Sequence, residues 1–128
     1  MRILIADDHE VVRRGVRSLL ESQEASSIDE AANGKEAVEK AFELKPDLVV
    51  LDVTMPILDG LSAAKQIKKS NPTVPIVILS IHNGPEMIRA TQRAGASAFV
   101  TKSDLSSVLL KAVSAVLQGK TFFSDGNA

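Results

Sequence analysis

Five short apolar runs alternate with longer amphipathic segments along the chain. Apolar runs of this length, bounded by polar or turn-forming residues, are typical of strands. The run at residues 48–51 holds no polar residue, which indicates a strand buried on both faces, as in a parallel sheet. Only the second run is weak. The predicted strands are Arg2–Ala6, Ser27–Ala31, Leu48–Leu51, Ile76–Ser80 and Ser97–Lys102.

Apolar residues at helical spacing follow each predicted strand and predict five helices. The first runs from Glu10 to about Ser22, and its arginines are expected to form a solvated face. Pro85 suits the start of the fourth helix, while Gly95 and Gly119 suit the ends of the fourth and fifth. The positions predicted to mark the helices' apolar faces are Val12, Val16, Leu19 and Leu20, then Ala37, Val38, Ala41 and Phe42, then Leu61, Ala64 and Ile67, and finally Leu105, Val108, Leu109, Ala112, Val113, Val116 and Leu117.

Strict alternation of strand and helix predicts a single-domain, doubly wound α/β fold of the flavodoxin-like kind, (βα)5. Parallel neighbours need crossover connections, and helices usually supply them. A closed eight-stranded barrel needs about 250 residues, so an open five-stranded parallel sheet is expected. The domain is predicted to span residues 1–120. Residues 121–128 would be a tail or the start of a linker, and Phe122 and Phe123 fit either a severed linker or packing against the domain.

Polar side chains stand at the carboxyl ends of four of the five predicted strands. They are Asp7 with Asp8, then Asp52, Ser80 and Lys102. Because parallel strands all point the same way, these residues converge on one edge of the sheet, where open α/β folds bind ligands. One such residue could be an ordinary solvated turn residue. Three carboxylates, a hydroxyl and an ammonium together predict a functional site.

Three close carboxylates repel one another unless one is protonated or a cation joins them. Oxygen ligands favour Mg²⁺, which keeps positions open for phosphate oxygens, and Mn²⁺ is expected to substitute for it. The absence of cysteine and the scarcity of histidine argue against zinc. A carboxylate beside such an ion can attack phosphorus and form an aspartyl phosphate. Lys102 and Ser80 would then bind the phosphoryl oxygens.

Composition narrows the class of protein. Fifteen lysines and arginines nearly balance sixteen aspartates and glutamates, so nothing marks the whole surface as a nucleic-acid binder. No apolar run approaches membrane-spanning length, and the start of the chain does not resemble a secretory signal. The expectation is a soluble, cytoplasmic domain that contacts neither nucleic acid nor membrane.

The ordered motifs resemble those of receiver domains of two-component response regulators, over essentially the whole chain. They are D-D after the first strand, D-x-x-M-P-x-x-D-G around Asp52, a hydroxyl residue after the fourth strand and G-A-x-x-F-x-x-K at the fifth. The resemblance implies a CheY-like fold and transfer of a phosphoryl group to Asp52 from a phosphohistidine of a sensor histidine kinase. It implies a metal site at Asp7, Asp8, Asp52 and the Thr54 backbone carbonyl, with Asp7 acting mostly through water, phosphoryl contacts at Ser80 and Lys102, and a switch at Ser80 and Phe99.

The subfamily resembled is the NarL/FixJ type. The signs are D-D-H-E-x-x-R-x-G-x-x-x-L-L at the start and G-K-x-F-F-S after the last helix. Members usually carry a DNA-binding helix-turn-helix domain beyond this point, so the full-length protein is expected to be a transcription regulator. Phosphorylation would turn Phe99 inward and reshape the face made by the fourth helix, fifth strand and fifth helix. Homodimer formation on phosphorylation is left open.

The same residues leave other functions to consider. A stand-alone receiver or an interaction scaffold (a pseudo-receiver) would keep the fold, although the complete residue set argues against the scaffold. A magnesium-dependent phosphohydrolase would need a second acid two residues after Asp52, where Thr54 stands. The domain is therefore expected to catalyse only its own phosphotransfer and dephosphorylation. For His9 a metal or phosphocarrier role is conceivable beside the favoured interpretation as a cap-region residue, and His82 would either influence hydrolysis or face water. Neither histidine is assigned to the site.

Overall fold

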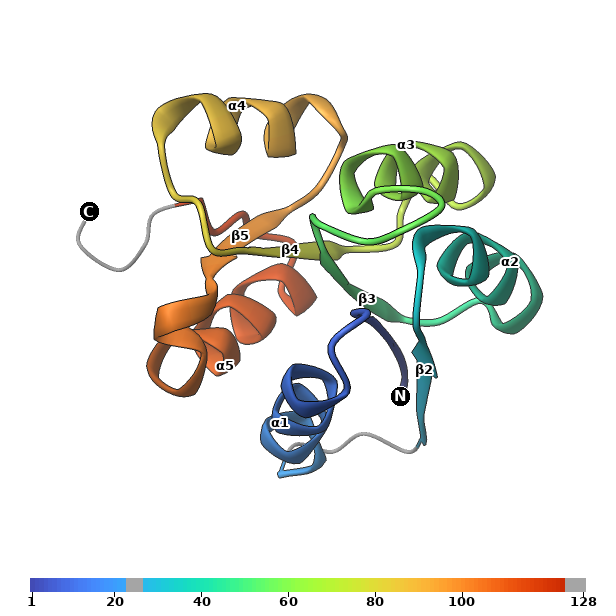
Figure 1. Ribbon diagram of the computed structural model, residues 1–128, viewed down its shortest axis with the longest axis horizontal. Coiled ribbons are helices and arrows are strands. Elements are labelled where there is room, and N and C mark those ends of the chain that lie inside the picture. Colours follow the sequence, from blue (N-terminus) through green and yellow to red (C-terminus); the bar gives the residue numbers. More distant parts are fainter. Residues whose placement is uncertain (23–26, 124–128) are drawn as a thin grey trace.

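The structure is a computed structural model that describes residues 1–22 and 27–123 (Figure 1). Five strands and five helices alternate along it, as the sequence predicts. The strands are β1 (Arg2–Ala6), β2 (Ser27–Ala31), β3 (Leu48–Asp52), β4 (Ile76–Ser80) and β5 (Ala98–Thr101). The helices are α1 (Glu10–Glu21), α2 (Gly34–Leu44), α3 (Gly60–Ser70), α4 (Pro85–Arg93) and α5 (Leu105–Leu117), with a 3₁₀ turn, η1, at Lys102–Asp104.

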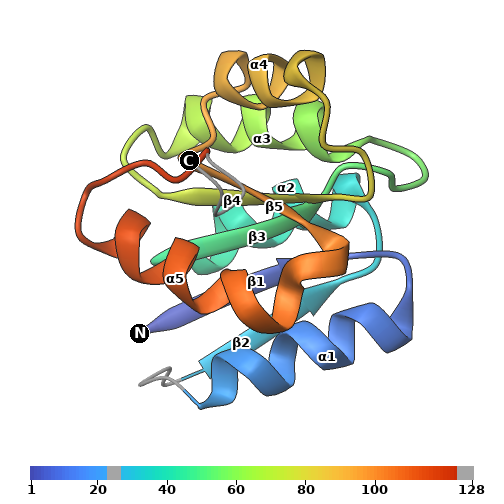
Figure 2. The same cartoon turned by 90° about the vertical axis from the view of Figure 1, so that its left-hand side faces the viewer.

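The strands form one parallel sheet in the order β2-β1-β3-β4-β5. Helices α1 and α5 cover one face, and α2, α3 and α4 cover the other (Figures 1 and 2). This confirms the predicted doubly wound α/β fold. The order changes direction at β1, so β1 and β3 lie side by side in the middle of the sheet and their carboxyl ends meet. None of the helices within the described ranges is long and apolar enough to cross a membrane.

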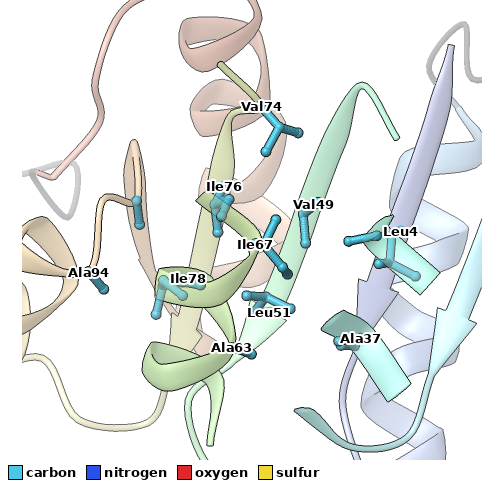
Figure 3. Close-up of a cluster of buried hydrophobic side chains, with 14 of the residues drawn as sticks. Leu4, Ala37, Val49, Leu51, Ala63, Ile67, Val74, Ile76, Ile78 and Ala94 are labelled. Atoms are coloured by element: carbon cyan, nitrogen blue, oxygen red, sulfur yellow. The ribbon is translucent and has the colours of Figure 1, made fainter. Parts of the chain in front are cut away.

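Two apolar clusters fill the space between the sheet and its helices. Successive strand residues point to opposite faces, so Val49 and Leu51 join the cluster under α2, α3 and α4, whereas Leu48 and Val50 join the one under α1 and α5. Figure 3 shows the first cluster, in which alanines of the helices lie against branched side chains of the strands. All of β3 is buried, which fits a central strand without polar residues before its end.

Two predicted apolar positions face solvent instead. Phe42 in α2 is 69% exposed and Leu117 in α5 is 44% exposed. Helix α2 packs through Gly34, Ala37 and Ala41, and position 42 lies about 100° around the helix from Ala41. The prediction that Phe42 marks the core face was therefore wrong, because small residues set the contact and the aromatic ring points away from it.

The described residues that follow α5 pack on the domain. Phe122 forms an isolated parallel bridge with Ala98 of β5, so of the two alternatives for this segment the structure has the packed one. The fifth strand is also shorter than predicted, because Lys102 lies in the 3₁₀ turn that follows it.

Candidate functional site

The carboxyl ends of β1, β3 and β5 bring two carboxylates and an ammonium into contact. The Nζ atom of Lys102 lies 3.2 Å from Oδ2 of Asp7 and 3.1 Å from Oδ1 of Asp52. Asp7 is fully buried and Asp52 is 2% exposed, so the pairs are shielded from water. The convergence expected from the strand ends is therefore present, although Lys102 reaches it from just beyond its strand.

Four side chains could hold a metal ion at this edge. Asp7, Asp8, His9 and Asp52 each offer a ligand atom, and these atoms lie within 4.8 Å of one another. Oδ2 of Asp52 is buried and lacks a hydrogen-bond donor, whereas Oδ2 of Asp7 has the ammonium of Lys102 at 3.2 Å. A buried carboxylate oxygen without a donor costs free energy, and a cation would satisfy it. The donor set fits a hard ion such as Mg²⁺, since carboxylates dominate it.

Burial and neighbouring charges shift the pKa values of Asp52 and Lys102. Burial raises the pKa of Asp52 and the charge of Asp7 raises it further, and together these outweigh the opposite effect of Lys102. Burial on its own would lower the pKa of Lys102, but hydrogen bonds and attraction from Asp52 and Asp7 raise it overall. Lys102 therefore stays charged, while the Asp52 carboxylate is held at a cost that a second cation would relieve.

The ring of His9 lies next to the carboxylates, although the sequence analysis does not assign this residue to the site. Its backbone N–H donates to Oδ1 of Asp7 at 2.8 Å. Its Nδ1 lies 3.1 Å from Oδ1 of Asp8 and 3.3 Å from Oδ1 of Asp7. The residue occupies the N-cap position of α1 but makes no side-chain cap bond there. Its place directly after the two acids is the sequence signal for the metal role that was considered less favoured than a cap-region role.

Ser80 ends β4 in a buried position next to the central strand. Its Oγ accepts a hydrogen bond from the backbone N–H of His82 at 2.9 Å, and the residue is 2% exposed. This bond uses an oxygen lone pair and not the hydroxyl proton. Leu79, directly before it, pairs with Asp52 across the sheet, so Ser80 stands one residue beyond the level of Asp52. The side chain of His82 is exposed, as expected.

The other two expected residues occupy different surroundings. Thr54 is exposed in the loop after β3, and a hydrogen bond from its backbone lowers the pKa of Asp52. A role for its carbonyl stays a prediction. Phe99 is fully buried on β5, in the cluster under α2, α3 and α4. Its ring thus already lies inside the domain, and a change of rotamer also stays a prediction.

The loop between β3 and α3 is locked against the end of β3. The N–H of Gly60 donates to the Val53 carbonyl at 2.8 Å, and a Cβ at Gly60 would lie 2.0 Å from the Asp52 carbonyl oxygen. Ile57, at the loop's outer turn, has φ 73° and is 75% exposed. Positive φ is strained for a β-branched residue, so the contacts around the loop must hold its backbone in this conformation.

Helix α1 holds the backbone of the acid pair through an arginine. Arg13 donates from Nη1 to the Asp7 carbonyl at 2.7 Å and from Nε to Glu30 at 2.6 Å. Arg17 donates to the other oxygen of Glu30 at 2.7 Å. Burial raises the pKa of Glu30, but the hydrogen bonds and charges of the two arginines lower it overall. The prediction of a merely solvated arginine face was therefore wrong for Arg13 and Arg17.

Comparison with known proteins gives the family. The response regulator receiver domain family matches residues 3–114. A protein-glutamate methylesterase/protein-glutamine glutaminase of Archaeoglobus fulgidus is 43% identical over 122 residues, which make up 94% of this chain and 35% of that protein. Response regulator protein VraR of Staphylococcus epidermidis is 38% identical over 125 residues, or 96% of this chain and 59% of VraR. The chain spans little more than half, or less, of the length of these curated relatives.

Solved structures agree with the sequence comparison. The crystal structure of a LuxR-family two-component response regulator from Aurantimonas sp. SI85-9A1 matches with a TM-score of 0.87 at 36% identity, covering 94% of this chain and 87% of that one. The family match covers most of the chain, and the fold is that of its members. The chain therefore belongs to the response regulator receiver domain family and is a two-component signalling domain of the NarL/LuxR type.

Proposed function

We propose that this domain receives a phosphoryl group on the carboxylate of Asp52 from a phosphohistidine of a sensor histidine kinase. In that step a P–O bond to the carboxylate forms while the P–N bond breaks, and the imidazole keeps the electron pair and takes up a proton. The observation that carries the proposal is the burial of the Asp52 carboxylate and the contacts of its two oxygens. This side chain is a buried carboxylate with one oxygen on Lys102 and the other without a donor.

The surrounding residues have complementary roles in this proposal. Asp7, Asp8, Asp52 and the Thr54 backbone carbonyl would hold Mg²⁺, or Mn²⁺ in its place, with Asp7 acting mostly through water. When bound, the ion would offset negative charge on the carboxylates and the incoming phosphoryl oxygens. Lys102 would bind a phosphoryl oxygen by charge, since its ammonium already lies 3.1 Å from Asp52.

Ser80 and Phe99 would couple the presence of the phosphoryl group to a change in the surface of the domain. The Ser80 hydroxyl proton is not used in its bond with the His82 N–H, so the hydroxyl can donate to a phosphoryl oxygen. Movement of Ser80 toward the phosphoryl group would favour the buried position of Phe99 and reshape the face of α4, β5 and α5. The ring is already buried here, so the change would be a shift in the population of this arrangement.

The wider setting of the domain is also a proposal. We propose a cytoplasmic domain, bounded near residue 120, that controls a C-terminal helix-turn-helix DNA-binding domain in the full-length protein. It would catalyse only its own phosphotransfer and dephosphorylation. It would contact neither DNA nor membrane itself, and phosphorylation would offer a route to a homodimer. A stand-alone receiver or scaffold is the alternative, and the buried Asp52–Lys102 pair speaks against a pure scaffold, since a binding surface needs no such group.

Intact-mass measurement tests the phosphoacceptor directly. The chain is incubated with a small phosphodonor and Mg²⁺ and compared with Asp52→Ala and with a sample that contains a chelator. Asp59→Ser is a matched control, because Asp59 is another carboxylate in the same loop and serine keeps its cap on α3. We expect one magnesium-dependent phosphoryl adduct in the wild type and in Asp59→Ser, and none in Asp52→Ala. An adduct that persists in Asp52→Ala contradicts the assignment of the acceptor, and no adduct in a folded wild type favours the scaffold.

A further inference from the structure

The chain reverses direction after α5 and returns to the sheet. Gly119 has φ 82°, a left-handed conformation that favours glycine. Its N–H donates to the Val116 carbonyl at 3.1 Å, and the N–H of Lys120 donates to the Ala115 carbonyl at 2.9 Å, which closes the helix. In Figure 2 the red chain beyond α5 turns back and rises beside β5 toward α4. The reversal therefore directs the following residues at one edge of the sheet.

Phe122 occupies that edge through its backbone. β5 is the last strand in the order, and an edge strand offers unpaired N–H and C=O groups to any neighbouring segment. Phe122 pairs with Ala98 in parallel. Its N–H donates to the Ser97 carbonyl at 2.9 Å, and its carbonyl accepts from the N–H of Phe99 at 2.9 Å. The segment thus adds one rung of a sixth strand.

The two aromatic residues of the segment pack on opposite faces of the sheet. Phe122 packs against the apolar cluster under α1 and α5, whereas Phe123 packs against the cluster under α2, α3 and α4. Neighbouring residues of an extended chain point to opposite sides, so the segment holds the edge from both faces. Phe99 belongs to the same cluster that receives Phe123. Phe99, the expected switch residue, is therefore joined to this segment by a hydrogen bond to Phe122, and it lies in the same apolar cluster as Phe123.

We propose that residues 120–123 are a latch on the edge of β5, through which the phosphorylation state of Asp52 reaches the chain beyond residue 123. The inference rests on the proposed function, which gives Phe99 its switch role. The backbone of Phe99 lies between Ile78 of β4 and Phe122, so a displacement of Phe99 moves or breaks the bond to Phe122. In the structure the ring is buried and the latch is closed. Phosphorylation, which favours the buried ring, would therefore tighten the latch.

Linkage requires the effect to run in both directions. If phosphorylation tightens the latch, a closed latch must favour the phosphorylated arrangement by the same factor. Removing the latch would then weaken the binding of a phosphoryl mimic at a site that no latch residue contacts directly. A purely structural role of Phe122 predicts lower stability but no such loss.

Amide hydrogen exchange followed by NMR tests the latch in the whole chain, with beryllofluoride and Mg²⁺ as the phosphoryl mimic. We expect the amides of Phe99 and Phe122 to exchange about fivefold more slowly when the mimic is bound. Phe122→Pro removes the N–H that donates to Ser97, while Phe122→Leu keeps it together with an apolar side chain. The apparent affinity for beryllofluoride is expected to fall about fivefold in Phe122→Pro and to stay unchanged in Phe122→Leu.

Two results would overturn the latch. One is unchanged or faster exchange at Phe122 with the mimic bound, and the other is equal beryllofluoride affinity in the wild type and in folded Phe122→Pro. The phosphoryl adduct on Asp52 separates this failure from that of the proposed function. If the wild type forms the adduct but shows no coupling, only the latch proposal is contradicted. If the wild type forms no adduct, the proposed function, on which the latch rests, is contradicted as well.

Discussion

At the scale of single residues, the surroundings of Asp52 oppose the charge of its carboxylate. Burial and the neighbouring Asp7 raise its pKa above the ordinary value of 3.8, and Lys102 lowers it by less. The unfolded chain therefore releases this proton at a lower pH than the folded domain does. Between 3.8 and the raised value the folded state binds more protons, so stability falls as pH rises through this window. Above it the whole cost of the charge is present.

Asp52→Asn removes that charge while keeping the shape of the side chain. We expect the variant to be more stable than the wild type at pH 7 by about 1–2 kcal/mol, because an underpaired buried charge is lost and Lys102 keeps Asp7 as its partner. The gain should shrink as pH falls through the window and vanish below 3.8. Urea unfolding followed by circular dichroism, with a chelator present, measures the gain in stability at pH 7 and its dependence on pH. A variant that is less stable at pH 7, or a gain independent of pH, would contradict this view of Asp52.

Sequence reasoning reached these residues because each follows an apolar strand, and parallel strands bring their ends together. It placed Asp7, Asp52 and Lys102 at one edge, where the structure has them in contact. It could not decide whether the ring of His9 faces the acids, and it did not predict the hydrogen bond from Arg13 to the Asp7 carbonyl. Their contacts depend on side-chain rotamers and on how α1 packs against β2. A local hydrophobic pattern predicts neither the rotamers nor this packing.

At the scale of elements, close packing of backbone fixes the loop that carries the site. A Cβ at Gly34 would lie 1.9 Å from the Leu58 carbonyl oxygen, and one at Gly60 would lie 2.0 Å from that of Asp52. The starts of α2 and α3 therefore both touch backbone of the segment from Asp52 to Leu58. A Cβ at Gly15, in the middle of α1, would meet nothing within 4 Å among the described residues.

These glycines make a matched pair of substitutions. Gly60→Ala is expected to destabilise the domain by about 2–3 kcal/mol, because backbone must shift to admit the methyl group. It should also slow phosphorylation of Asp52, whose carbonyl is displaced. Gly15→Ala is expected to stabilise it by about 0.5–1 kcal/mol through helix propensity, with phosphorylation unchanged. Thermal unfolding and intact mass give the two readouts, and equal effects of the two substitutions would show that the loop does not depend on this contact.

Element types were predictable because apolar periodicity and breaker residues agree along the chain. The errors lie where two rules competed. Phe42 fits a helical stripe by hydrophobicity, but small residues determine which face of α2 packs. The pairing of Phe122 with β5 was undetermined for another reason: an edge strand accepts many segments, and the sequence of the tail does not say which way the chain turns after Gly119.

At the scale of the whole molecule, the proposed metal site joins elements far apart in the sequence. Asp7 and Asp8 follow β1 and Asp52 ends β3, so one ion would bind groups that the unfolded chain keeps separate. A ligand that binds only the folded state stabilises it by mass action, by about 2.7 kcal/mol at one hundred times the dissociation constant. Metal binding should therefore raise the free energy of unfolding of the whole domain, and not only support phosphorylation.

Mg²⁺ is expected to raise the unfolding midpoint of the wild type in a concentration-dependent way, and by several degrees at saturation. Asp8→Asn should lose most of this increase, because it removes a charged ligand while leaving the Lys102 pairs intact. Asp59→Ser, outside the cluster, should keep it. Thermal unfolding by circular dichroism suits this chain, which has no tryptophan or tyrosine to report by fluorescence. An equal increase in Asp8→Asn would mean that the ion stabilises the domain elsewhere, and the strand-end cluster would lose its role as the metal site.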